Sequence, residues 1–154
     1  MNVIDFLEQT PERVRSLIAR QSEETLSFKP APDEFSLREN VLHLHDIDIE
    51  GYERRVMRIL IERDPIFPDV DGAALARERN YNAQPIAPAF EAFAASRARS
   101  IERLRTIAPA DLERTGDLEG AGRITLQELL ERWALHDGEH LAEMARCLSM
   151  ASSL

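Results

Sequence analysis

Two histidines near the end of the chain have the spacing of a helical metal site. His136 and His140 are four residues apart, so in a helix their rings lie one turn apart on the same face. Imidazole rings that face a core cost free energy unless their nitrogens gain partners. A metal ion can be that partner, and so can backbone groups or acids, and the pair alone leaves both open. The face is apolar by its other members, which are Leu126, Leu129, Leu130, Trp133, Leu141, Met144 and Leu148.

The residues between these histidines limit the kind of site. Asp137 follows His136, so the segment is not the H-E-x-x-H motif of zinc proteases, in which a glutamate acts as the base. Gly138 costs about 1 kcal/mol relative to alanine inside a helix, which indicates either a close backbone approach or simple tolerance. Two ligands make a weak site, so a third ligand is needed.

The only other histidines are His43 and His45, near the start of an earlier amphipathic segment. On a helical wheel His45 falls in the middle of the apolar face, whereas His43 falls outside it, beside Asn40 and Ile47. Periodicity alone therefore favours His45 as the third ligand. The apolar face consists of Leu37, Val41, Ile49, Tyr52, Val56 and Ile59.

Four long amphipathic segments must position these side chains. They span residues 2–21, with an interruption at Thr10-Pro11, and residues 36–63, 85–107 and 125–148. Four such segments in 154 residues predict an all-α four-helix bundle in a single domain, residues 1–154. The connection between the second and third segments is long enough for a crossover.

Sequence signals also mark the helix ends and the loops. Ser36 with Glu39, and Thr125 with Glu128, match the capping-box pattern at two helix starts. Residues 73–84 are polar and predict a short helix or an ordered loop. Residues 114–123 contain three glycines and predict a loop, with a hint of strand at residues 123–124 too short to matter.

Two stretches of this chain resemble the DinB/YfiT-like superfamily. That family's second-helix motif is W-S-x-x-E-x-L-x-H-L-x-D, which FSLRENVLHLHD resembles with Phe35 in place of the tryptophan. Its last helix carries T-L-x-x-L-L and then H-D-x-x-H-L, which RITLQELLERWALHDGEHLAEM resembles. The resemblance implies one metal ion held by His43, His136 and His140. It thus favours His43 against the periodicity, with His45 as a pocket or core residue and the alternative ligand.

The resemblance also implies a chemistry. Three neutral ligands leave a divalent ion with an open position, which can bind and activate water or a thiol. Relatives include low-molecular-weight-thiol S-transferases, so we expect thiol transfer to a small-molecule substrate at zinc, nickel, iron or manganese. Asp46 and Asp137 match the family motif and are the candidate catalytic residues, with solvated helix surface as the alternative.

Three other readings of the sequence stay open. The first is a metal-dependent hydrolase of small amides or esters. The second is a non-enzymatic homodimer whose metal site is structural or vestigial, and a homodimer is expected in any case. The third is an HD-type phosphohydrolase, because His45-Asp46 and His136-Asp137 are His-Asp doublets, but the rest of that pattern is missing.

Two buried candidates lie outside the histidine set. Arg97 interrupts the apolar stripe of the third segment, and a buried guanidinium needs an anion. Asp48 is the preferred partner and Asp46 the second, which predicts a structural ion pair, with the grip on a substrate carboxylate as the alternative. Cys147 is the only cysteine, which excludes an internal disulfide and predicts core packing.

The charge and the apolar content of the sequence argue against binding to nucleic acids or membranes. The formal net charge is −9, whereas a nucleic-acid-binding protein needs a basic surface. The same charge disfavours an anionic membrane surface. The sequence shows neither a signal segment nor an apolar run long enough to span a bilayer, so we expect a cytoplasmic protein.

Overall fold

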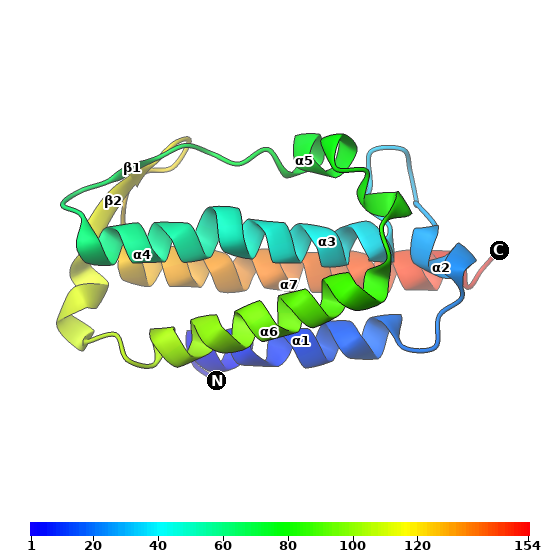
Figure 1. Ribbon diagram of the computed structural model, residues 1–154, viewed down its shortest axis with the longest axis horizontal. Helices are drawn as coiled ribbons and strands as arrows, with labels where there is room; N and C mark the ends of the chain where they lie inside the picture. The colour runs from blue at the N-terminus through cyan, green and yellow to red at the C-terminus, as the bar shows by residue number, and fades with distance from the viewer.

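A computed structural model describes residues 1–154 and shows four long helical segments packed side by side (Figure 1). The structure therefore has the predicted all-α, four-helix architecture. Three of the segments are single helices, α1 (Val3–Ile18), α6 (Ile86–Leu104) and α7 (Leu126–Ala151). The remaining one is continuous through α3 (Leu37–Ile47), a π-helical turn (Asp48–Glu53) and α4 (Arg54–Ile61).

The connections set the directions of these helices. A short helix that the sequence did not predict, α2 (Glu23–Ser27), lies between α1 and α3. Residues 62–85, called the strap below, lead from the end of α4 back along the bundle to the start of α6, so α3 and α6 run in the same direction (Figure 1). The strap contains β1 (Ile66–Phe67), α5 (Gly72–Glu78) and a 3-10 turn at Tyr81–Ala83.

A small sheet corrects the prediction of a loop at residues 114–123. After a 3-10 turn (Pro109–Glu113), β2 (Thr115–Leu118) and β3 (Gly122–Thr125) form an antiparallel hairpin, and β1 of the strap pairs in parallel with β2. Gly120 and Gly122 take positive φ angles of 83° and 80° in the turn, where glycine costs least. The strands are too short to show a period-2 pattern, but pairing with the strap stabilises them.

Both predicted capping boxes are present. The Ser36 hydroxyl accepts from the Glu39 backbone N–H while the Glu39 carboxylate accepts from the Ser36 N–H, and Thr125 and Glu128 do the same at the start of α7. These contacts fix where the two histidine-bearing helices begin. The polar residues at the helix starts therefore set the register of the site.

A buried polar network joins all four long segments at mid-bundle. Arg97 on α6 donates to both carboxylate oxygens of Asp48 at 2.9 Å, which confirms the predicted ion pair. It also donates to Asp137 at 2.6 and 3.1 Å. Its fifth contact, to the Leu7 carbonyl at 2.8 Å, replaces the helical hydrogen bond that Pro11 cannot donate. α1 therefore continues through the proline as one helix, and no Arg97 donor is left for a substrate.

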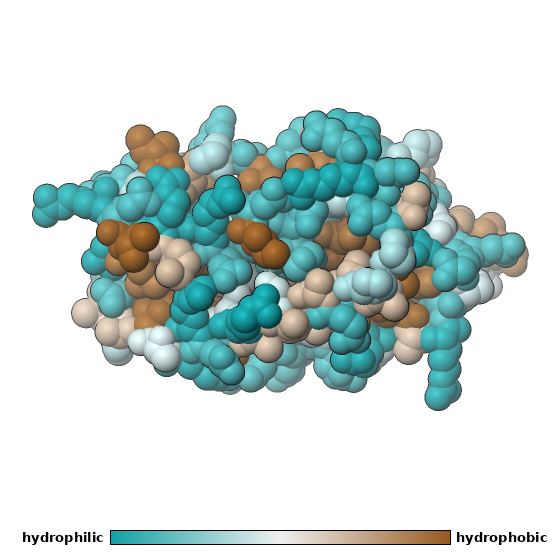
Figure 2. All heavy atoms as spheres, in the orientation of Figure 1, coloured by the Kyte–Doolittle hydropathy of each residue, from teal (hydrophilic) through white to brown (hydrophobic).

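Apolar clusters fill the bundle on either side of this network. On α6, Phe93 belongs to one cluster and Ile101 to the other, with Arg97 between them. Cys147 is fully buried in the first cluster, as predicted for core packing. On the side drawn in Figure 2, exposed apolar side chains form separate small patches in a mainly hydrophilic surface. No helix has the length and apolar character needed to cross a membrane.

Candidate metal centre

Three of the four histidines converge between α3 and α7. Ring nitrogens of His43, His136 and His140 all lie within 4.8 Å of one another. The Nε2 atoms of His43 and His136 are 3.0 Å apart, and the His140 ring centroid lies 4.4 Å from each of the other two. His45 is not part of this group. The structure thus brings together the three residues that the family resemblance implied, not the set that periodicity favoured.

The burial of residues along α3 explains why a helical wheel chose the other histidine. Leu37, Val41 and Leu44 form the expected buried face, but Asn40, His43 and Ile47 form a second buried face under α5 and α7. The π-helical turn then adds residues to one turn and shifts the phase of α4 relative to α3. A single wheel over residues 37–59 therefore averages two registers, and Ile49, which it placed in the core, is 41 % exposed.

A neighbouring amide fixes which nitrogen of His140 is free. Asn40 donates from Nδ2 to the Ser36 carbonyl at 3.0 Å, so its Oδ1 faces His140 Nδ1 as an acceptor at 2.7 Å. Glu143 offers a second acceptor at 3.2 Å. His140 must then carry its proton on Nδ1, which leaves the Nε2 lone pair free to bind a metal. The sequence signal was a polar residue three positions before His43, which we did not assign a role.

Burial keeps the other two rings neutral. It lowers the pKa of His43 to about 3, with a further contribution from His140. It lowers the pKa of His136 to about 2, with smaller contributions from His140, His43, Arg97 and Arg55. Neutral imidazole is the form that binds metals, so both rings are in the state that a ligand needs.

The donor set fits a divalent ion. Metal–nitrogen bonds of about 2.0–2.1 Å place two ligand nitrogens roughly 3 Å apart, close to the 3.0 Å between the Nε2 atoms of His43 and His136. Between neutral rings only one hydrogen bond can form across that contact, because one of the two Nε2 atoms must carry the proton. A cation between the two rings would bind the Nε2 lone pairs of both His43 and His136, whereas a hydrogen bond satisfies only one of them.

The strap covers the histidines from one side. A Cβ atom at Gly72, the first residue of α5, would lie 2.5 Å from His43 Cε1 and 2.8 Å from its Nδ1. Only glycine therefore lets the strap approach this ring so closely. The C-terminal part of the strap is tied to α3 through Asp46. This carboxylate accepts hydrogen bonds from Tyr81 and, at 2.7 Å, from Arg79.

The two candidate catalytic acids occupy different positions. Asp46 is partly exposed at the edge of the strap and is engaged by Tyr81 and Arg79. Asp137 is fully buried, with one oxygen accepting from Arg97 and Thr10 and the other from Arg97. Both carboxylates thus already accept hydrogen bonds from neighbouring side chains. Their predicted catalytic role stays a prediction.

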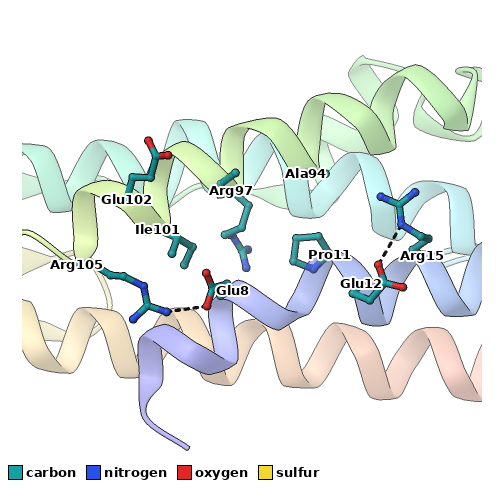
Figure 3. Close-up of a pocket in the computed structure, with 10 residues that line it drawn as sticks. Glu8, Pro11, Glu12, Arg15, Ala94, Arg97, Ile101, Glu102 and Arg105 are labelled. Atoms are coloured by element: carbon teal, nitrogen blue, oxygen red, sulfur yellow. Dashed lines mark hydrogen bonds and ion pairs between the residues drawn. The ribbon is translucent and has the colours of Figure 1, made fainter.

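Two surface grooves differ in their relation to the histidines. One, of about 480 Å³, lies between α4 and the strap, where Asp71 and Ala74 flank the glycine that contacts His43. The other, of about 500 Å³, lies between α1 and α6, with Pro11 and Arg97 along it (Figure 3). Arg97 points from α6 towards α1 there, but all its donors are used within the bundle. Of these two grooves, only the strap groove is lined by residues next to Gly72, which packs on His43.

Comparison with known proteins gives consistent results. The sequence profile of the DinB superfamily matches residues 7–144. A curated protein of Oceanobacillus iheyensis, named provisionally as a metal-dependent hydrolase, is 26 % identical over 141 residues, which cover 92 % of this chain and 81 % of that protein. The structure of YfiT from Bacillus subtilis, described as a probable metal-dependent hydrolase with an unusual four-helix bundle topology, superposes with a TM-score of 0.86 at 20 % identity. That likeness covers 94 % of this chain and 83 % of YfiT, and it concerns the fold.

Proposed function

Because this chain belongs to the DinB superfamily, we propose that His43, His136 and His140 bind one divalent metal ion that activates a nucleophile towards a small-molecule substrate. The observation that carries this proposal is the convergence of three imidazoles from two helices, with Nδ1 of His140 held by Asn40 so that its Nε2 can face a metal. Structural metal sites are closed by four protein ligands, whereas three ligands leave a position for a reactant.

The side chains around the histidines have definable tasks. A bound metal ion would supply a lowered pKa for a coordinated water or thiol. Asn40 orients His140, and Phe35, whose ring centroid lies 5.1 Å from that of His43 and stacks on His140, shields the rings from solvent. Asp46 holds the strap in place, and proton transfer by this acid requires that it release Tyr81 or Arg79.

The nucleophile distinguishes the two enzymatic candidates. The names of the relatives favour water, and hence hydrolysis of an amide or ester. The histidine motifs resemble those of the DinB/YfiT-like superfamily, whose members include thiol S-transferases, and this resemblance favours a low-molecular-weight thiol. We propose a thiol as the nucleophile and hydrolysis as the second candidate, with zinc, nickel, iron or manganese as the ion and a homodimer as the assembly.

One experiment separates these possibilities. The protein, loaded in turn with each metal, is incubated with cysteine, glutathione, bacillithiol or mycothiol and the electrophile monochlorobimane, and in parallel with nitrophenyl esters and anilides. Metal-dependent conjugation that disappears in His136→Ala supports thiol transfer, and ester or anilide cleavage without any thiol supports hydrolysis. Metal binding with neither activity favours the non-enzymatic reading. The matched control is His45→Ala, which removes a histidine outside the cluster.

A further inference from the structure

One buried arginine in this protein has no carboxylate partner. Three arginines are buried, and two of them are paired: Arg97 with Asp48 and Asp137, and Arg38 with Glu23. Arg55 on α4 is only 8 % exposed yet forms no ion pair. Its one hydrogen bond is a long one, from Nη2 to the Pro68 carbonyl at 3.3 Å. The Nε and Nη1 groups of Arg55 have no partner within the protein and are not fully buried, so most of the five N–H groups of the guanidinium remain available to a ligand.

Arg55 is one of the residues that line the strap groove. Its guanidinium lies back along the helix near Gly51, where a Cβ atom would be 3.8 Å from Nη1, an ordinary contact. Burial lowers the pKa of Arg55, and Tyr52 and Asp69 act in the opposite direction. The side chain is therefore held at the wall of an open groove without the counter-charge that the other buried arginines have.

Arg55 is also close to the histidine cluster. Its guanidinium carbon lies 5.7 Å from the centroid of the Tyr52 ring, and the His136 ring centroid lies 5.5 Å from that of Tyr52. The charge of Arg55 contributes to lowering the pKa of His136. The same groove reaches Asp71 and Ala74, on either side of the glycine packed on His43. The lining of the groove therefore includes both Arg55 and the strap residues beside Gly72, the residue that covers His43.

We propose that Arg55 binds a carboxylate group of the ligand in the strap groove, while the ligand's other end faces the metal centre. The planar guanidinium suits a carboxylate, which it can bind through two parallel hydrogen bonds. A single negative charge is favoured over a phosphate dianion because the groove already has more acids than bases. Its four acids are Glu50, Asp69, Asp71 and Glu78, and its three arginines are Arg54, Arg55 and Arg58. Only the assignment of the ligand's reacting end rests on the proposed function.

The carboxylate subsite is testable on the metal-free protein. Propionate is titrated while the side-chain Nε–H signal of Arg55 is followed by NMR, and that signal is assigned by its absence in Arg55→Gln. We expect a saturable shift with propionate, none with the isosteric neutral propionamide, and a weaker response to inorganic phosphate. The matched control is Arg54→Gln, which removes an exposed arginine of the same groove and leaves the propionate response intact. No saturable shift, or a stronger response to phosphate, overturns the proposal.

A second titration links the subsite to the metal centre. Cobalt-loaded protein is titrated with ω-mercapto acids of increasing length and with the matching mercapto alcohols, and the sulfur-to-cobalt absorption band reports binding. One acid of matching length is expected to bind about tenfold more tightly than its alcohol, as for a hydrogen bond to a charged group, and Arg55→Gln removes that preference. Equal affinities at every length contradict the subsite but leave the metal centre standing. Propionate binding without cobalt binding contradicts the proposed function alone.

Discussion

Replacing Gly72 by alanine tests how the strap positions His43. Gly72 has no left-handed φ angle, so the backbone accepts alanine and any effect comes from the new methyl group. That methyl would lie 2.5 Å from His43 Cε1, whereas ordinary contacts begin at 3.4 Å. The ring and the strap must therefore separate by roughly 1 Å to reach a normal carbon–carbon distance.

The expected loss of metal affinity in Gly72→Ala follows from the narrow range of distances that metal ligands tolerate. The atoms that the new methyl group meets belong to the end of the His43 side chain, which can turn, so we expect the ring to move before the strap backbone does. Ligand distances in metal sites are held to about 0.2 Å, and a shift of roughly 1 Å is several times larger. Disturbing the groups that orient a metal ligand costs about 10–100-fold in affinity, which corresponds to about 1.4–2.7 kcal/mol.

Competition with a chromogenic chelator measures this affinity directly. The matched control is Gly138→Ala, because a Cβ at Gly138 meets only Phe6 at 3.7 Å, an ordinary contact. This second glycine lies between His136 and His140, and alanine there should leave metal affinity unchanged and raise stability by about 0.5–1 kcal/mol. Wild-type affinity in Gly72→Ala would show that the strap moves instead of the ring, and would refute the reasoning.

Three other substitutions give distinct outcomes. Asn40→Ala removes the nearer of the two acceptors of His140 and leaves the longer contact to Glu143, so we expect metal affinity to fall about 10-fold, the lower end of the usual range for such a partner. The same competition measures it, and an unchanged affinity would contradict the assigned role. Arg97→Met leaves two buried carboxylates without a cation and should lower the free energy of unfolding by about 3–5 kcal/mol in urea titrations; a loss within error would mean that the network contributes little. Burial raises the pKa of Asp48 to about 6, above the value of about 3.9 in the unfolded chain. Between these two pH values the folded state therefore binds more protons than the unfolded state. The contribution of Asp48 to the free energy of unfolding then falls as pH rises from about 4 to about 6. Urea titrations across that range should therefore show a more positive dependence of stability on pH in Asp48→Asn than in the wild type, and identical slopes would contradict the raised pKa.

The helices and their starts were predictable from local chemistry. The capping boxes at Ser36 and Thr125 and the proline and glycine positions mark boundaries that depend only on nearby residues. The partner of Arg97 was also predictable, because a guanidinium in an apolar stripe requires an anion from a facing helix. The second anion, Asp137, was missed in that role because its position beside His136 suggested chemistry instead.

The choice between His43 and His45 shows what hydrophobic periodicity cannot predict. A wheel assumes one register and one buried face, and the π-helical turn and the overlying strap remove both conditions. No local signal in the sequence predicts the π-helical turn. The family motif gives the position of the ligand histidine directly, so it does not depend on the helical register. The motif is thus the better guide to the cluster that the structure shows.

The parts that the sequence did not predict depend on contacts between distant segments. The β2–β3 hairpin pairs with a strap strand some fifty residues earlier, at Ile66↔Asp117 and Phe67↔Leu118. Arg55 lies on an amphipathic helix and looks like an ordinary surface arginine until the strap buries it. Such roles follow from the path of the chain, which composition and period do not specify.

The metal content of the protein, purified without an affinity tag, tests the central claim most directly. Elemental analysis, after dialysis against a mixture of divalent ions, should find about one ion per chain in the wild type and in His45→Ala. His43→Ala, His136→Ala and His140→Ala should each retain only a small fraction of it. Metal content well below about half an ion per chain, or the same content after any of these three substitutions, would contradict the account.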